Sequence, residues 1–389
     1  MAGLFAGIGG IELGFHQCLG DKLDTVLLCE SWAPAQTVLR TQFPNVELHP
    51  DVAELRDLPG NLDVLAAGFP CTDLSQAGRT AGIRGDQSGL VGHVFEMLRL
   101  IKQSGRKTPW VLIENVPNML TLDRGEAMAY LVSELESLGY RWAYRVVDSR
   151  FTGTPQRRRR VILVASVTDD PRKVLFADDS GFDDSILRGD SFGFYWTEGR
   201  TGVGWAKDAT PTLKGGSSVG IPSPPAIWIP ERELGSRFIT PTIEDSESLQ
   251  GFERGWTSSA SDGKRNGPRW KLVGNAVTVG VSKWVAGRIL DPGEYRNDLA
   301  SAWERNGGWP HAAWGEKGRV WRVDISEFPT QSSYKHLLDV VRIEDCPPLS
   351  GRAASGFWSR LSQTNLGRYP NFREHIRDYV ELATMVKIA

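Results

Sequence analysis

Short apolar runs alternate with amphipathic stretches along the first 165 residues. Four apolar runs have the length of buried strands: residues 25–29, 62–67, 110–113 and 161–165. Two stretches between them repeat apolar residues at helical spacing: 91–101 and 128–138. Strands that alternate with helices in this way predict an α/β domain built on a parallel sheet.

The pattern changes after Ser166. Residues 166–270 are rich in Gly, Pro, Ser and Asp, carry scattered aromatic side chains and contain no long amphipathic stretch, so they predict a smaller, irregular, mostly β domain. Residues 271–290 again show the α/β pattern of the first 165 residues and include an apolar helix. Residues 291–389 predict a C-terminal helical extension. The predicted domains are therefore 1–165, 166–270, 271–290 and 291–389.

Composition places the chain among ordinary water-soluble proteins. It has 389 residues, more than one compact core needs, with 40% hydrophobic and 24% charged residues. No apolar run approaches the length of a membrane span, so no membrane contact is expected. The four cysteines are widely spaced, which predicts free thiols, no metal site and a cytoplasmic location.

Charge is nearly balanced overall but not locally. The formal net charge of −2 argues against a protein that coats nucleic acid by bulk charge. Residues 141–160, however, hold seven arginines against one aspartate. Such a run is either a solvated face or a surface that meets phosphate groups.

Polar residues follow several of the predicted strands directly. The run 62–67 ends in Gly68-Phe69-Pro70-Cys71, and the run 110–113 ends in Glu114. Parallel sheets bind ligands at the carboxyl ends of their strands, so Cys71 and Glu114 are expected at one edge. Pro70 stiffens the turn that carries the thiol. An inert, buried cysteine remains the alternative for Cys71 alone.

A glycine turn opens the chain. Residues 5–10, Phe-Ala-Gly-Ile-Gly-Gly, follow a short strand and precede a helix, a pattern that suits a nicotinamide dinucleotide, a flavin or S-adenosylmethionine. Glu30 ends the next strand and can accept hydrogen bonds from ribose hydroxyl groups. Trp32 and Asp51 follow at further strand ends, so the three side chains can hold an adenosine.

Taken in chain order, these motifs resemble those of the DNA cytosine-5 methyltransferases, over residues 4 to 290. The matching motifs are Phe-Ala-Gly-x-Gly-Gly at 5–10, Glu30 with Trp32, Asp51, Phe69-Pro70-Cys71, Glu114-Asn115-Val116, Gln156-x-Arg158-x-Arg160, Arg237 to Leu249-Gln250-Gly251-Phe252, and Gly274-Asn275-Ala276-Val277. Two positions depart from the family pattern: Gly3, where Asp is usual, and Gln87, where Arg is usual.

The resemblance implies a Rossmann-like, S-adenosylmethionine-dependent methyltransferase sheet with a target recognition domain at 166–270. The cofactor S-adenosyl-L-methionine would be bound by Phe5, Ala6, Gly7, Ile8, Gly9, Gly10, Glu30, Trp32, Asp51, Val52, Gly68, Pro70, Asn275 and Ala276. Double-stranded DNA would be contacted by Ser75, Gln76, Gly78 and Arg79 in a lid at 72–89, by Thr212, Leu213 and Arg237, and by the arginines of 141–160.

It also implies a mechanism. The Cys71 thiolate adds to carbon 6 of a flipped-out cytosine, which makes carbon 5 nucleophilic enough to accept a methyl group. Glu114 donates a hydrogen bond to ring nitrogen 3, Arg158 binds the cytosine carbonyl oxygen, and Arg160 anchors these groups. The base that then removes the carbon-5 proton is left open.

Three other functions compete with this interpretation: an RNA cytosine-5 methyltransferase, a catalytically inactive DNA-binding regulator, and a nicotinamide-dependent oxidoreductase. The RNA-directed branch carries a Cys-Phe-Thr signature that this chain lacks. For the DNA enzyme we expect a monomer that shares its target with a restriction endonuclease without a stable complex, or that acts as a solitary or phage methylase. The target sequence depends on residues of 166–270 that reach base edges.

Overall fold

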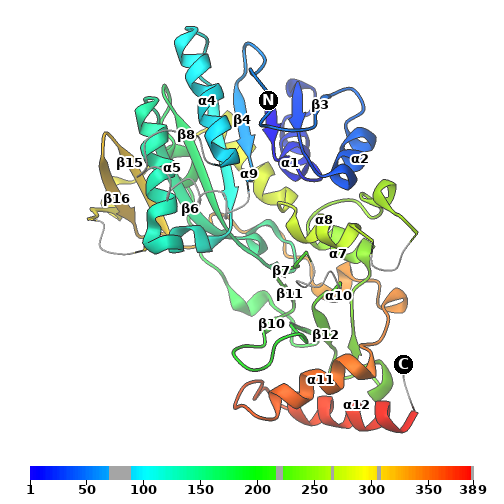
Figure 1. The fold of residues 1–389 in the computed structure, drawn as a ribbon. Coiled ribbons are helices and arrows are strands. Elements are labelled where there is room, and N and C mark those ends of the chain that lie inside the picture. The colour runs from blue at the N-terminus through cyan, green and yellow to red at the C-terminus, as the bar shows by residue number, and fades with distance from the viewer. Residues whose placement is uncertain (70–88, 216–221, 264–266, 305–307, 387–389) are drawn as a thin grey trace. The chain divides into compact units, whose positions relative to one another are not determined.

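The computed structural model describes residues 1–69, 89–215, 222–263, 267–304 and 308–386 (Figure 1). The chain forms two compact units, each built from three segments. Unit 1 consists of Met1–Thr152, Arg159–Phe182 and Ala276–Gln331. Unit 2 consists of Gly153–Arg158, Asp183–Asn275 and Ser332–Ala389.

A mixed sheet forms the centre of unit 1. Its ten described strands lie in the order β14 (Ala300–Ala302), β16 (Arg319–Val323), β15 (Ala312–Glu316), β6 (Arg141–Asp148), β8 (Arg159–Ser166), β5 (Trp110–Asn115), β4 (Val64–Ala67), β1 (Ala2–Leu4), β2 (Leu27–Cys29) and β3 (Glu47–His49). The five strands from β5 to β3 are parallel, and the others pair antiparallel. Strands were predicted at β2, β4, β5 and β8, and these predictions are confirmed.

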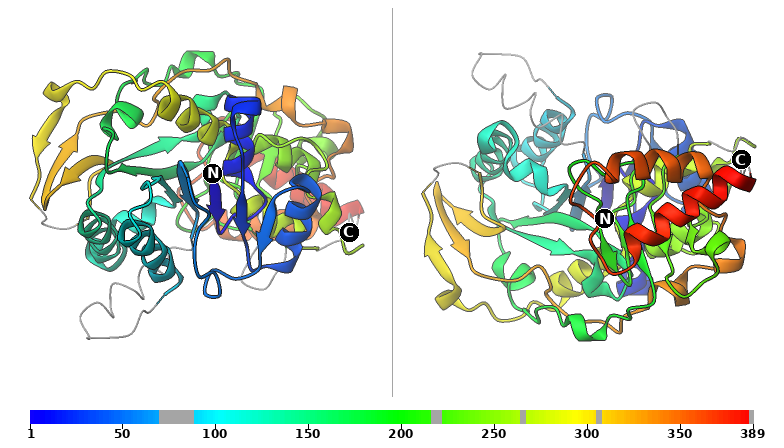
Figure 2. Two further views of the ribbon diagram at one scale, coloured as in Figure 1. Left: turned by 90° about the horizontal axis from the view of Figure 1, so that it is seen from above. Right: turned by 90° about the horizontal axis from the view of Figure 1, so that it is seen from below.

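Helices cover both faces of this sheet (Figure 2). Those of unit 1 are α1 (Gly10–Leu19), α2 (Ala33–Gln42), α4 (Leu90–Gln103), α5 (Glu126–Ser137), α6 (Arg172–Leu175) and α9 (Val279–Leu290). The apolar stripes of α4 and α5 pack into one hydrophobic cluster, and α1, α6 and α9 pack into another. The helices predicted at 91–101 and 128–138 are thus confirmed with their buried faces.

Two parts of the sheet were not predicted from the sequence. Strand β6 lies within the arginine-rich segment, where charge hides the apolar alternation. Strands β14, β15 and β16 extend the sheet beyond β6, with Ala312 opposite Arg145. Their residues mix Trp and Arg on a half-exposed hairpin, so no continuous apolar run marks them.

Unit 2 combines a small sheet with helices. Its four-stranded antiparallel sheet has the order β10 (Ala206–Lys207), β9 (Phe192–Phe194), β12 (Ala226–Trp228) and β13 (Phe238–Ile239). A parallel pair joins β11 (Thr210–Pro211) to β7 (Gln156–Arg157). The helices are α7 (Ile243–Leu249), α8 (Arg269–Asn275), α10 (Leu337–Val340), α11 (Gly351–Leu361) and α12 (Phe372–Val386). The irregular β domain and the C-terminal helices of the sequence prediction are both present.

Aromatic side chains form the core of unit 2. Phe194 and Phe238 of the small sheet pack against Phe357 of α11 and Phe372 of α12. This cluster explains why a segment without long apolar runs still folds compactly. Among the described residues of the whole chain, no helix is long and apolar enough to cross a membrane.

Substitution of Gly14 by alanine is expected to lower the free energy of unfolding. A β-carbon at this position of α1 would lie 2.6 Å from the Val279 carbonyl oxygen at the start of α9, and backbone cannot move aside easily. Overpacking of this kind costs about 1–3 kcal/mol. Chemical denaturation measures it, with Gly60→Ala as the control, because a β-carbon there meets no atom within 4 Å. Equal losses in both variants would contradict close packing of α1 on α9.

Candidate active site

The carboxyl ends of the parallel strands in unit 1 meet at one edge of the sheet. Leu4 at the end of β1 lies opposite Cys29 of β2 and Ala67 of β4, and Ala67 lies opposite Ile113 of β5. The residues that follow are therefore neighbours along this edge: Phe5, Glu30, Gly68 and Glu114.

The glycine turn after β1 is held in an unusual backbone conformation. Phe5, Gly7 and Gly9 have φ values of 56°, 57° and 81°. A left-handed conformation is rare for a bulky residue such as Phe5, and such strain is concentrated at ligand sites. There is a second reason for glycine at position 9, because a β-carbon there would lie 2.3 Å from the ring of Phe43. Ala6 and Ile8 complete the turn, and Gly10 begins α1.

Glu30 ties this turn to the neighbouring strand end. One carboxylate oxygen accepts a hydrogen bond from the backbone N–H of Gly7 at 2.9 Å, and the other accepts one from Trp32 at 2.8 Å. The backbone N–H of Ala6 donates to the carbonyl oxygen of Cys29 at 3.1 Å. The carboxylate is half-buried and fixed, so it can accept ribose hydroxyl groups without reorganising.

The residues at this edge fit an adenosyl cofactor. Nothing lies within 4 Å of a β-carbon built on Gly7, so the turn leaves open space where a ligand can approach the backbone. The Oδ1 atom of Asp51 accepts from Ala53, and its Oδ2 atom makes no hydrogen bond within the described part of the chain. Val52 is buried in the core of unit 1, and Gly68 donates to the Leu4 carbonyl. Asn275 ends α8 in unit 2, and Ala276 begins the last segment of unit 1.

Replacement of Glu30 by alanine is expected to raise the KM for S-adenosylmethionine roughly 10- to 100-fold with little change in kcat, because hydrogen bonds to a charged acceptor are each worth about 1.5–3 kcal/mol. Initial rates against cofactor concentration measure both constants. The control is Glu54→Ala, which removes an exposed carboxylate from the same unit. A fall in kcat alone would contradict a cofactor-binding role for Glu30.

Glu114 and Arg160 form an ion pair at the end of β5. The Nε atom of Arg160 lies 2.9 Å from Oε1 of Glu114, and the two side chains are 13% and 11% exposed. β8 runs antiparallel to β5, and this pairing brings Arg160 close to Glu114. Arg160 thus holds the carboxyl group in one position, and its anchoring role in catalysis stays a prediction.

Asn115 restrains the loop that leads toward Cys71. Its side-chain amide donates to the carbonyl oxygen of Phe69 at 3.0 Å, and its Oδ1 atom accepts from the backbone N–H of Val116 at 2.8 Å. Phe69 also packs edge-on against Phe5, with ring centroids 6.1 Å apart. Asn115 was identified in the sequence only as part of the Glu-Asn-Val motif. The structure shows that its side chain holds the backbone at Phe69.

Several predicted site residues lie outside the described ranges. They are Pro70, Cys71, Ser75, Gln76, Gly78 and Arg79, together with the rest of the lid up to residue 88. The helix after the lid, α4, begins at Leu90 with Gly89 before it. The other three cysteines, Cys18, Cys29 and Cys346, are free thiols as predicted.

Within unit 2 the arginine motif is joined to the Thr212-Leu213 turn. The hydroxyl of Thr212 donates to the Arg157 carbonyl at 2.9 Å, and the Leu213 backbone N–H donates to Gln156 at 3.0 Å. The buried guanidinium of Arg158 donates to the carbonyl oxygens of Leu213 and Gly274, both at 3.2 Å. Arg158 therefore links the Thr212-Leu213 turn to α8. Its predicted role toward cytosine would come in addition to this structural role.

The prediction that the arginines of 141–160 form one phosphate-facing surface is wrong. Arg145 is 1% exposed and donates to the carbonyl oxygens of Ser326, Leu175 and Asp178. Burial lowers the pKa of its guanidinium to about 10 despite the nearby Asp179. Arg158 is equally buried, and Arg150 pairs with Asp148 at 2.9 Å. These arginines bind backbone and carboxylate groups of the protein itself.

The remaining predicted DNA contact, Arg237, is half-buried at the start of β13 in unit 2. Its Nε atom donates to the carbonyl oxygen of Arg232 at 3.0 Å. That hydrogen bond fixes the side chain near its own turn, and its role toward DNA remains a prediction.

Comparisons with known proteins agree with this geometry. A sequence profile described as "C-5 cytosine-specific DNA methylase" matches residues 1–184. The chain is 44% identical over 383 residues to the type II methyltransferase M2.BsuMI of Bacillus subtilis, covering 95% of each chain. It is 27% identical to the type II methyltransferase M.MspI of a Moraxella species over 306 residues, 74% of this chain and 69% of that one. The solved structure of the S. pombe Dnmt2 methyltransferase matches 75% of this chain and 98% of its own chain. The TM-score is 0.54 and the sequence identity is 15%, so this match supports the fold.

Proposed function

The chain belongs to the C-5 cytosine-specific DNA methylases, and from that premise we propose that it methylates carbon 5 of cytosine in double-stranded DNA with Cys71 as the nucleophile. S-adenosylmethionine, when bound, supplies the electrophilic methyl group. Cytosine must leave the base stack first, since carbon 5 and carbon 6 are not accessible inside the duplex.

Four residues would have a part in this reaction: Cys71, Glu114, Arg158 and Arg160. The Cys71 thiolate forms a bond to carbon 6, and electron density moves through the ring toward nitrogen 3. Glu114, in its protonated carboxylic acid form, donates to that nitrogen as charge develops on it, and Arg160 keeps the carboxyl group in place. After methyl transfer a base removes the carbon-5 proton, and the bond to Cys71 breaks. Arg158 would hold the cytosine carbonyl oxygen.

The arrangement along the carboxyl edge of unit 1 is the observation that carries this proposal. The strained glycine turn follows β1, the fixed Glu30 carboxylate follows β2, and the Glu114 ion pair lies at the carboxyl end of β5, all in the parallel part of the sheet. Asn115 anchors the carbonyl of Phe69, two residues before Cys71. These contacts support a cofactor site and a proton donor at the edge where the first described range ends at Phe69, two residues before Cys71.

Transfer of a labelled methyl group from S-adenosylmethionine to plasmid DNA tests the proposal, with transfer RNA as the competing substrate. Methylation of DNA alone is the expected result, and bisulfite sequencing of DNA from expressing cells then identifies the target. Methylation of RNA alone would refute the proposal. DNA binding without methylation would favour the inactive regulator, and binding of a nicotinamide cofactor would favour an oxidoreductase.

We further propose that the enzyme acts as a monomer in a restriction-modification system. The sequence relatives M2.BsuMI and M.MspI are both type II methyltransferases. The substrate would be DNA in the cytoplasm. An endonuclease with the same target would act separately, without a stable complex. Residues 166–270 would contain the target recognition elements, including Thr212 and Leu213.

A further inference from the structure

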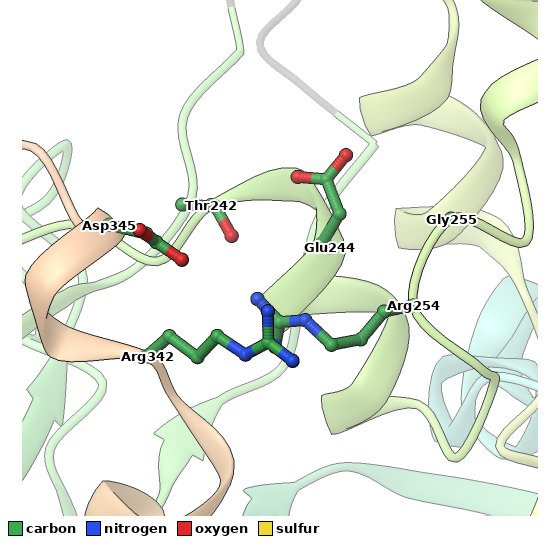
Figure 3. Close-up of a pocket in the computed structure, with 6 residues that line it drawn as sticks. All are labelled: Thr242, Glu244, Arg254, Gly255, Arg342 and Asp345. Atoms are coloured by element: carbon green, nitrogen blue, oxygen red, sulfur yellow. The ribbon is translucent and has the colours of Figure 1, made fainter.

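Unit 2 contains a cavity of about 370 Å³ that is lined by residues from two of its three segments, Asp183–Asn275 and Ser332–Ala389. The lining residues are Thr242, Glu244, Arg254, Gly255, Arg342 and Asp345. In Figure 3 the side chains of Arg254 and Arg342 extend from opposite sides toward the middle of this cavity. Two groups of like charge face each other there.

A single buried carboxylate holds the side chain of Arg254 and the backbone of Arg342. Asp245, in α7, is fully buried, and its Oδ1 atom accepts from Nη1 of Arg254 at 2.8 Å and from the backbone N–H of Arg342 at 3.1 Å. Its Oδ2 atom accepts from the backbone and the hydroxyl of Thr242. Burial favours the protonated form, yet these hydrogen bonds keep the pKa of Asp245 below its usual value. The Arg254 side chain and the backbone at Arg342 are therefore held in place before any ligand arrives.

The charge of only one of the two arginines is compensated. Asp245 pairs with Arg254, whereas the exposed side chain of Arg342 makes no hydrogen bond or ion pair with any described residue. Glu244 at the rim pairs with Arg269 at 3.0 Å. The Arg342 guanidinium therefore has N–H donors available for a ligand, and an anion bound beside both arginines would reduce the repulsion between their like charges.

The chemistry of the cavity selects the anion. The planar fork of a guanidinium group matches the oxygens of a phosphate group. Asp245 already pairs with Arg254 and Glu244 with Arg269, so Arg342 is the arginine of this cavity that remains to be compensated, and a single negative charge suits the cavity better than a polyphosphate does. A phosphodiester carries one such charge, and its sugars can extend into the remaining volume. We propose that Arg254 and Arg342 bind one backbone phosphate of the DNA substrate, an inference that rests on the proposed function.

The salt dependence of DNA binding tests this proposal directly. Each phosphate contact adds about 0.9 to the slope of log K against log salt. DNA affinity falls for both proteins when the salt concentration rises from 50 to 200 mM. The factor by which it falls should be about 3.5-fold smaller for Arg342→Gln than for the wild type. The same reduction is expected on duplexes with and without the target sequence, because a phosphate contact is independent of base identity.

The matched control is Arg377→Gln, which removes an exposed arginine of α12 that pairs with Asp378 in the same unit. Its slope should equal that of the wild type. An unchanged slope for Arg342→Gln would overturn the proposal. A variant that loses thermal stabilisation by inorganic phosphate but keeps its DNA slope would also overturn it, in favour of free phosphate. The slope needs no turnover, so a wild-type protein that binds DNA without methylating it would refute only the proposed function.

Discussion

Replacement of Cys71 by serine is expected to abolish methyl transfer to DNA, down to the background of the assay, while the protein stays folded. A serine hydroxyl is not ionised near neutral pH and does not add to carbon 6, so carbon 5 never becomes nucleophilic. Transfer of a labelled methyl group measures the loss, and circular dichroism confirms the fold. Cys18→Ser, a change in the last turn of α1, serves as the control and should keep activity.

DNA that carries 5-fluorocytosine provides a second measurement for the same prediction. The fluorine at carbon 5 cannot leave as a proton does, so the bond between Cys71 and carbon 6 persists after methyl transfer. The wild type and Cys18→Ser should form a protein–DNA adduct that survives denaturation, and Cys71→Ser should not. Normal turnover on this DNA would contradict covalent catalysis.

The other cysteines are poor candidates for the nucleophile on physical grounds. Burial raises the pKa of Cys29 to about 12, with the neighbouring Glu30 and Asp51 adding to the effect. Burial also raises the pKa of Cys346 to about 12, next to Asp245. Both thiols therefore stay protonated at neutral pH and are unreactive. Cys18 lies in α1, away from the carboxyl edge of the sheet, which leaves Cys71.

The sequence predicted the catalytic unit well because its signals are local. A buried parallel strand is a continuous apolar run, and the residue after it must lie at the sheet edge, so Glu30 and Glu114 could be placed without coordinates. The glycine turn was equally visible, since its backbone conformation demands Gly7 and Gly9.

Contacts between distant parts of the chain could not be read in this way. Arg145 donates a hydrogen bond to the carbonyl oxygen of Ser326, 181 residues further along the chain. A count of charges within a short segment cannot show that such a side chain is buried. Asn115 reaches Phe69 across 46 residues. The β14 to β16 strands become recognisable only through their pairing with β6. Tertiary packing decides which strands pair, in which register, and which side chains meet. A short window of sequence carries no information about such packing.

Conversion of Glu114 to glutamine is expected to lower kcat about 10²- to 10⁴-fold, the usual contribution of general acid catalysis. The amide keeps the shape of the side chain but transfers no proton to ring nitrogen 3, so charge accumulates on the ring as Cys71 adds. The KM for S-adenosylmethionine should change little, because Glu30 and the glycine turn are untouched. Single-turnover rates at saturating DNA and cofactor measure the effect on chemistry.

The substitution also removes the carboxylate from its ion pair with Arg160, so the two effects must be separated. Glu136→Gln is the matched control: Glu136 accepts hydrogen bonds from Trp142 and Gly318 in the same unit, away from the carboxyl edge. It should lose some stability and keep its single-turnover rate. If Glu114→Gln were only a structural change, its rate below the melting transition would match that of Glu136→Gln, and the role of Glu114 as proton donor would be refuted.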